Sequence, residues 1–358
     1  MSLLTADIDP KGKPMNSRLV RSSINIGLLL LVNALWGIQF TFYKLLEHVP
    51  SPAVSLVFVV LAGSFVFPFF LVERCRRLRA GVPTDNKERS LRRWDNIFGF
   101  LMAGVVGATA SSLFYAWGVS KSTASNGALL GLTGPILTGV LAVLILRERM
   151  TLVRWVSLAI ALTGVVLLSM RAPEGAAKEA GLAIDWAGLK SLLINNKYLV
   201  GNLLILAACA GGSLSNVFYK SLLRRFSVLE VLVGIYFLTT LANAAIVVCF
   251  EPSAFGALAA CSRREMVYLL LLGLNGGLTA ILWLFLVARL DVSQAVVSLY
   301  LTPIFGVLEA AVFLGEQITL LMVLGGAITL AGTVLVATMD KTSSETEPVP
   351  ETQPTIEP

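Results

Sequence analysis

The amino-acid sequence alternates long apolar runs with short polar segments along most of its length. A helix needs roughly 20 apolar residues to cross the hydrocarbon core of a bilayer, and most of the runs reach that length. The pattern therefore predicts an all-α polytopic membrane protein with ten transmembrane helices. Their expected bounds are Ile24–Leu46, Ala53–Val72, Ile97–Gly118, Ser125–Leu146, Leu152–Met170, Leu199–Leu222, Leu229–Phe250, Met266–Ala288, Ser293–Leu314 and Thr319–Thr338.

Hydroxyl residues stand where many of these helices are expected to begin. A Ser or Thr side chain in that position accepts a hydrogen bond from one of the first unpaired backbone N–H groups. The expected caps are Ser51, Ser125, Thr151, Ser227, Ser293 and Thr319.

The two halves of the chain repeat one another. Residues 125–151 align without a gap on residues 293–319, at an offset of 168. This register places Pro135 on Pro303 and Glu148 on Glu316. Each half then holds five predicted helices, and because five is odd, the second half enters the membrane upside down relative to the first. Inverted repeats of this kind place a substrate site near the middle of the membrane in many secondary transporters.

Five segments follow from this repeat. Residues 1–23 form a polar N-terminal segment, and 24–170 form the first five-helix repeat. Residues 171–198 form an external connecting loop, and 199–338 form the second repeat. Residues 339–358 are rich in Pro, Thr and Glu and have little to bury, so we expect a disordered cytoplasmic tail.

The distribution of Lys and Arg sets the expected orientation. These residues gather in the loops on the same side as the N-terminus, above all in residues 73–96. Cytoplasmic loops carry such an excess, so both termini are expected in the cytoplasm. No cleavable signal pattern precedes the first apolar run. We expect an integral protein of a bacterial inner (plasma) membrane, and whether it is a homodimer stays open.

Composition narrows the function further. The chain is 56% hydrophobic and 14% charged, outside the range of soluble domains, and its net charge of +6 lies in loops beside the spans. The bilayer therefore explains the basic residues better than a nucleic acid does. Four cysteines without paired spacing and a single histidine, His48, indicate no metal site and no cofactor. An intramembrane enzyme is disfavoured, because no serine–histidine pair and no paired acids can form inside the membrane.

Polar and aromatic residues recur on single faces of several predicted helices. Such groups are costly in an apolar span unless they meet partners or water, and one shared cavity would satisfy all these faces. Interhelical hydrogen bonding in a solid bundle is the alternative, and it uses the same residue types. The candidate lining of a cavity for a small-molecule substrate is Trp36, Gln39, Tyr43, Ser111, Tyr115, Asn126, Ser215, Asn216, Tyr219, Asn275, Thr279, Trp283, Gln294, Ser298, Thr302 and Glu309.

Glu309 differs from the other acids because it lies well inside a predicted span. Acids in that position are rare and usually face a cavity or a partner. Glu148 and Glu316 instead end their helices, where a structural role is favoured, because each can reach the free N–H groups at the next helix start, before Thr151 or Thr319. Pro135 and Pro303 each remove a backbone hydrogen bond in mid-span, so a gating kink or a purely architectural one is expected there.

These residues resemble those of the drug/metabolite transporter superfamily, specifically its EamA-type branch with ten spans. The resemblance covers about residues 24–338. The first helix contains Ala34-Leu35-Trp36-Gly37, and the paired prolines and terminal acids described above complete the match. The sequence Arg147-Glu148-Arg149 departs from the family's small-residue-then-Glu pattern, which Gly315-Glu316 keeps.

The resemblance implies a membrane exporter or exchanger of small organic solutes that does not hydrolyse ATP. Amino acids or amphiphilic amines suit the mixture of aromatic rings, amides and one acid on the polar faces. A lipid-headgroup flippase of the same superfamily and a non-transporting membrane scaffold stay open as alternatives.

Overall fold

The computed structural model is a bundle of helices, and it describes four stretches of the chain together with scattered positions between residues 152 and 167. The four stretches are 15–79, 94–146, 198–287 and 301–339. All regular structure in these residues is helical, which confirms the all-α fold class. The residues singled out from the sequence that lie outside the described part are Glu148, Thr151, Ser293, Gln294 and Ser298.

The helices follow the apolar runs closely. The described helices are α1 (Met15–Leu45), α2 (Ser51–Arg79), α3 (Trp94–Phe100), α4 (Thr109–Ser120), α5 (Ala124–Leu130), α6 (Gly134–Leu146), α9 (Leu199–Leu223), α10 (Val228–Phe250), α11 (Ser253–Ala259), α12 (Arg263–Val287), α14 (Leu301–Leu314) and α15 (Leu320–Met339). A π-helical stretch joins α3 to α4, and one 3₁₀ turn joins α5 to α6.

Within the described residues, six helices are long and apolar enough to cross a membrane, if the α3–α4 pair is counted as one. Two shorter apolar helices, within α14 and α15, accompany them. The protein is therefore an integral membrane protein, as the hydrophobic pattern predicts. The fifth predicted span, Leu152–Met170, lies mostly outside the described residues.

Four of the six expected helix caps lie in the described residues and can be compared with the structure directly. Ser227 caps α10 in a reciprocal arrangement with Glu230: its hydroxyl accepts from the Glu230 N–H at 3.3 Å, and that carboxylate accepts from the Ser227 N–H at 2.7 Å. The Thr319 hydroxyl likewise accepts from the N–H of Met322, one turn into α15. Ser125 is not a cap, because α5 begins one residue earlier and Thr123 supplies the capping hydroxyl. Ser51 is already the first residue of α2, one position past the cap.

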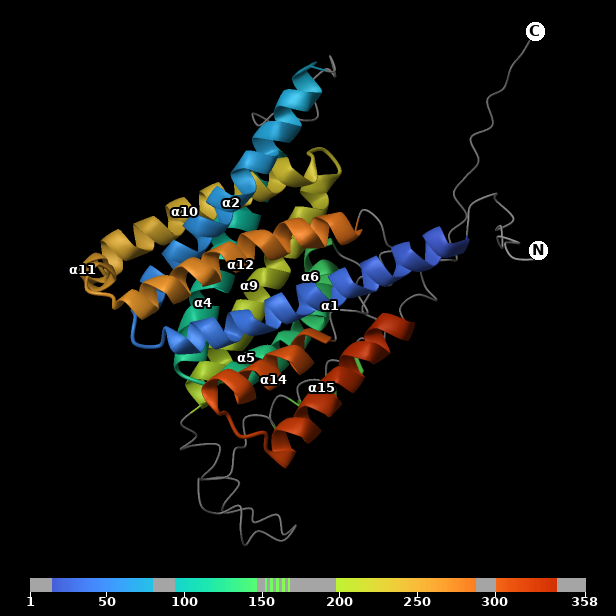
Figure 1. Ribbon diagram of the computed structural model, residues 1–358, viewed down its shortest axis with the longest axis vertical. Helices are drawn as coiled ribbons and strands as arrows, with labels where there is room; N and C mark the ends of the chain where they lie inside the picture. The colour runs from blue at the N-terminus through green and yellow to red at the C-terminus, as the bar shows by residue number, and fades with distance from the viewer. Residues whose placement is uncertain are drawn as a thin grey trace, which may run out of the picture.

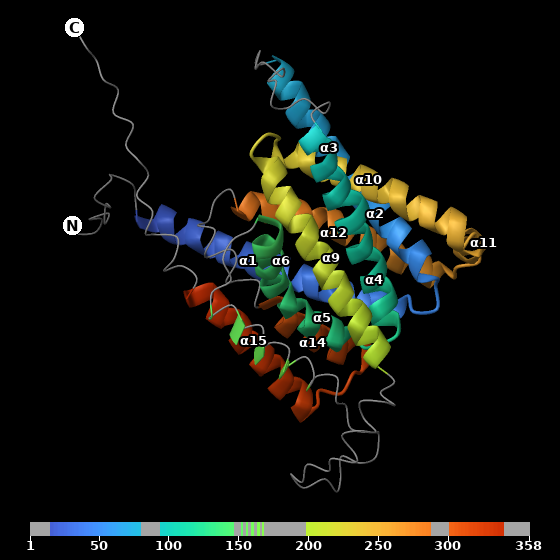
Figure 2. The same cartoon turned by 180° about the vertical axis from the view of Figure 1, so that it is seen from behind.

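The two halves interlock and pack in the same way from either side. Helix α1 lies along α14, and its repeat counterpart α9 lies along α6 (Figures 1 and 2). The contact of α1 with α12 has its equivalent in the contact of α9 with α4. The contact of α2 with α12 has its equivalent in the contact of α10 with the π-helical stretch of the third span. Exchange of the halves thus maps the contacts onto themselves, as expected for a duplicated fold.

Residues at the two ends of the bundle show that the repeats are inverted. One end brings together the ends of α1 and α4, the starts of α5 and α9, and Glu316 after α14. At the other end, Arg225 after α9 donates to the Asn96 side chain in α3 at 2.6 Å. Helix α9 therefore runs opposite to α1, its counterpart in the first half (Figure 1).

Glycines allow the halves to approach closely. A Cβ atom on Gly107 would lie 2.6 Å from the Ser215 backbone nitrogen of α9, and one on Gly118 would lie 2.9 Å from the Gly201 carbonyl oxygen. Small residues at helix crossings are how transmembrane helices gain packing contacts without a hydrophobic driving force. Gly107 belongs to the π-helical stretch Leu101–Ala108, which is consequently pressed against the backbone of α9.

Candidate functional site

A cavity of about 280 Å³ lies between the halves, at the meeting of α1, α4, α5 and α14. Its α1 wall consists of Trp36, Gln39, Phe40 and Tyr43, which are spaced by three and four residues and so share one helix face. The opposite walls contain Tyr115, Ala128, Gly131, Leu132, Thr302 and Pro303. We call this space the aromatic cavity.

The break between α5 and α6 shapes one wall of this cavity. Pro135 has no backbone N–H, and the helix tightens to a 3₁₀ turn, Gly131–Thr133, just before it. Side chains also bond to carbonyl groups beside this break: Ser213 of α9 donates to the Gly134 oxygen at 2.9 Å. A Cβ atom on Gly131 would lie 3.9 Å from both Phe40 and the Tyr115 hydroxyl, so the absence of a side chain there leaves the cavity open.

Aromatic rings surround much of the cavity. Phe40 and Tyr115 meet edge to face with ring centroids 5.6 Å apart. Trp36 packs against Trp283 of α12, with centroids 5.1 Å apart, so Trp283 supports the wall from behind. Rings in such arrangements present π faces that attract a cation, most strongly when water is excluded. The cavity is therefore suited to an amine.

The polar groups of the cavity lining are few, and each has a hydrogen-bond partner. The Gln39 amide donates to the Tyr43 hydroxyl at 3.3 Å, and the Tyr115 hydroxyl lies 3.1 Å from the Cys209 sulfur. Thr302 donates to the side-chain oxygen of Asn33 at 2.6 Å. A small number of placed polar groups in an otherwise apolar wall is typical of a small-molecule site.

The structure thus brings five of the predicted cavity residues, Trp36, Gln39, Tyr43, Tyr115 and Thr302, around one space. Four further lining residues escape a search for polar faces because they are apolar or lack a side chain: Phe40, Ala128, Gly131 and Leu132. Of these four, only Phe40 could have been predicted from the sequence, since it lies one turn after Trp36 on the same helix face.

Other predicted residues pack between helices and not along the aromatic cavity. Asn275 donates to the Leu35 carbonyl at 2.6 Å, and Thr279 donates to the Asn275 carbonyl one turn earlier. Asn126 joins Ser122 and Asn202 in a buried cluster at the end of the bundle. Asn275 and Asn126 thus make the interhelical bonds that the sequence left open as the alternative, whereas the hydrogen bonds of Thr279 stay within α12.

The remaining third- and sixth-span candidates also lie away from the aromatic cavity. A Cβ atom on Gly212 would touch the Ser111 hydroxyl at 3.1 Å, which places that side chain at the α4–α9 crossing. Ser215 is at the same crossing, beside Gly107, and Tyr219 packs in the cluster around Phe100. Asn216 is exposed on the surface of α9.

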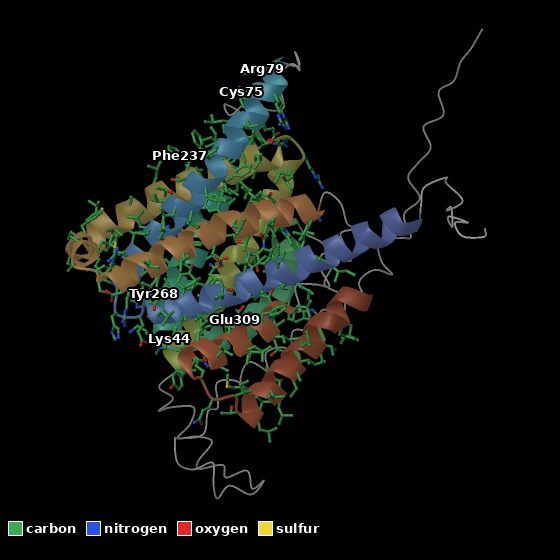
Figure 3. The ribbon with its side chains drawn as sticks, in the orientation of Figure 1. Lys44, Cys75, Arg79, Phe237, Tyr268 and Glu309 are labelled. Atoms are coloured by element: carbon green, nitrogen blue, oxygen red, sulfur yellow. The ribbon has the colours of Figure 1, made fainter. Side chains whose placement is uncertain are left out.

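Glu309 lies on α14 where that helix crosses α1 (Figure 3). One carboxylate oxygen, Oε2, is buried without a hydrogen-bond partner, and a Cβ atom on Gly37 would lie 2.7 Å from it. Thr302 of the aromatic cavity is seven residues earlier on α14, so the two side chains lie on similar faces two turns apart. A buried acceptor left unpaired is costly, which marks Glu309 as a candidate for proton or substrate binding.

Glu316 ties the second half to the first. Its two carboxylate oxygens accept from the backbone N–H groups of Ala124 and Ser125, at 2.8 and 3.1 Å. These groups begin α5, so the partner is the other repeat and not the start of α15 that the sequence suggested. The contact satisfies two of the orphan donors at the start of α5 and places a negative charge at the positive end of the helix dipole. Gly315, just before it, has a φ of 67°, which allows the chain to turn out of α14.

Two inverted helical repeats around a central cavity are the architecture of many secondary transporters. The model of the EamA-like transporter family matches residues 23–170 and 199–338. The chain therefore belongs to the EamA-like transporter family, within the drug/metabolite transporter superfamily, as the sequence motifs indicate.

Two known proteins show how far the likeness extends. A protein of Streptantibioticus cattleyicolor named "Probable terminal-alkyne amino-acid exporter" is 27% identical over 311 residues, which cover 86% of this chain and 94% of that protein. A solved crystal structure that is 19% identical matches with a TM-score of 0.54, over 90% of this chain and 99% of the other. The second likeness shows the fold alone.

Proposed function

We propose that this transporter exports small amino-acid-like solutes by alternating access, with the aromatic cavity as the central binding site. The ring of Trp36, Phe40, Tyr43 and Tyr115 is the observation that carries the proposal, because it offers π faces to a substrate amine. The Gln39 amide has two N–H groups, and the one that does not bind Tyr43 donates to the substrate carboxylate. The named function of the Streptantibioticus relative supports the same substrate class.

The inverted repeat supports the alternating-access part of the proposal. Helices α1 and α14 cross beside the cavity, and their counterparts α9 and α6 make the equivalent crossing in the other half. Two near-equivalent arrangements of such halves open the site first to one side and then to the other. Pro135 and Pro303 lie in or next to the cavity wall, where a local bend changes its width.

Transport by purified protein in liposomes tests this directly. Proteoliposomes loaded with labelled amino acids are expected to release or exchange them, with and without a pH gradient. Trp36→Ala should lower the rate per molecule at least tenfold, because it removes the largest ring from the cavity. Trp117→Ala, which deletes an exposed ring on α4, is the matched control and should transport at the wild-type rate.

Translocation of a fluorescent phospholipid is measured in the same liposomes. If the protein moves the lipid and no amino acid, it is a flippase and the proposed substrate class is wrong. If Trp36→Ala and Trp117→Ala transport equally well, the aromatic cavity is not the binding site.

A further inference from the structure

A second cavity adjoins the aromatic one and differs from it in chemistry. It occupies about 310 Å³ between α5, α14 and α15, and its lining includes Leu129, Val307, Met322 and Val323. All the described residues of its lining are apolar or glycine. Four of them, Ile304, Leu308, Ile318 and Val323, are about half exposed, so the space opens on the outer surface of the bundle. We call it the apolar chamber.

The two spaces share part of their walls. Leu132 of the 3₁₀ turn and Pro303 of α14 line both of them. Thr302, directly before Pro303, is turned to the aromatic cavity, while Ile304, directly after it, is turned to the apolar chamber. Leu132 and Pro303 thus stand between the two spaces. A molecule that occupies both must pass between these two residues, from aromatic and polar groups to aliphatic ones.

Chemistry of this kind selects a ligand with two unlike ends. We infer that the apolar chamber receives the unbranched aliphatic side chain of the transported amino acid, whose amine lies in the aromatic cavity. The inference rests on the proposed function and deepens it, because it names the side-chain class that the transporter prefers. The volume of the apolar chamber is several times that of one water-sized group, so the chamber accommodates a chain of several methylene groups.

Chain length should then set affinity. Each buried methylene contributes roughly fourfold in binding, which corresponds to about 0.8 kcal/mol, until the chamber is full. The chamber also discriminates against polar side chains, because its walls leave a buried hydroxyl or amide without a partner.

The test measures competition for transport in proteoliposomes by straight-chain amino acids, from alanine through norvaline and norleucine to aminooctanoate. For the wild type, the half-inhibitory concentration is expected to fall about fourfold per added methylene and then to level off. Val307→Phe places a ring in the chamber, so norleucine should lose at least tenfold in potency while alanine is unchanged. Val307→Ala enlarges the chamber and should move the optimum to a longer chain.

Val312→Phe is the matched control, since it makes the same change on α14 at a position that is 77% exposed and outside the chamber lining. It should reproduce the wild-type series. If no amino acid is transported by the wild type, the proposed function itself is wrong. Two results would overturn the inference while amino acids are transported. One is that potency does not depend on chain length, and the other is that Val307→Phe and Val307→Ala leave the series unchanged. In either case the chamber holds a lipid chain or nothing.

Discussion

The crossing of α1 and α14 gives the sharpest prediction about stability, through Gly37. A Cβ atom on this residue would lie 2.7 Å from the Gly306 backbone nitrogen, 3.1 Å from the Gly306 Cα and 2.7 Å from Glu309 Oε2. The carboxylate can rotate away, but the backbone of α14 cannot. Gly37→Ala should therefore push the two helices apart.

The size of the effect follows from the overlap. The distance to the Gly306 nitrogen is roughly 0.7 Å short of the 3.4 Å at which ordinary van der Waals contact begins. Overpacking of a well-packed interior costs typically about 1–3 kcal/mol. The higher helix propensity of Ala offsets up to about 1 kcal/mol of this, so the variant must be compared with another Gly→Ala change and not only with the wild type.

Gly27→Ala is that comparison, because Gly27 lies on the same helix and a Cβ atom there meets nothing within 4 Å. Relative to Gly27→Ala, Gly37→Ala should unfold a few degrees lower in a thermal melt of the detergent-solubilised protein, since about 1 kcal/mol corresponds to roughly 2–4 °C for domains of 150–250 residues and to less in a longer chain. Transport should fall as well, because Trp36 and Thr302 of the aromatic cavity flank this crossing on α1 and α14.

Equal melting temperatures and equal transport rates for the two variants would refute the reasoning, because they would mean that α1 and α14 do not approach as closely as the structure has it. The double variant Gly37→Ala/Glu309→Ala adds a further check. It relieves only the contact with the carboxylate, so it should recover part of the lost stability and not all of it.

Three further predictions concern the acids and the topology. Glu316→Gln leaves one of the two α5 N–H groups without its acceptor and should lower stability by about 1 kcal/mol, whereas Glu47→Gln, which removes only a part-exposed ion pair with Lys44, should have little effect in the same thermal melt. Glu309→Gln should reduce transport per molecule and flatten its dependence on pH while expression is unchanged; equal turnover with the wild-type pH profile would remove Glu309 from the mechanism. A variant with Cys75 as its only cysteine should react with an impermeant maleimide only after the membrane is opened, and labelling in intact cells would reverse the expected orientation.

Hydrophobic runs and the internal repeat were enough to determine the class of the fold and the ends of most helices. The bilayer requires every spanning segment to satisfy its own backbone hydrogen bonds, so a long apolar run has essentially one solution, a helix. The repeat then implied two inverted halves, because five helices return the chain to the opposite side. Local chemistry also determined the Ser227 cap, since its partner Glu230 is only three residues away.

Only the tertiary structure decided which polar residues share a space. Helical periodicity shows that Ser111 and Tyr115 lie on one face, but not that Tyr115 reaches the aromatic cavity while Ser111 packs at a helix crossing. In a membrane the sequence signal is weaker still, because lipid and protein interior are equally apolar and a lipid-facing Val312 resembles a chamber-lining Val307. The partner of Glu316 illustrates the same limit: its carboxylate meets N–H groups some 190 residues away in the chain, and only the interlocking of the two halves brings them together.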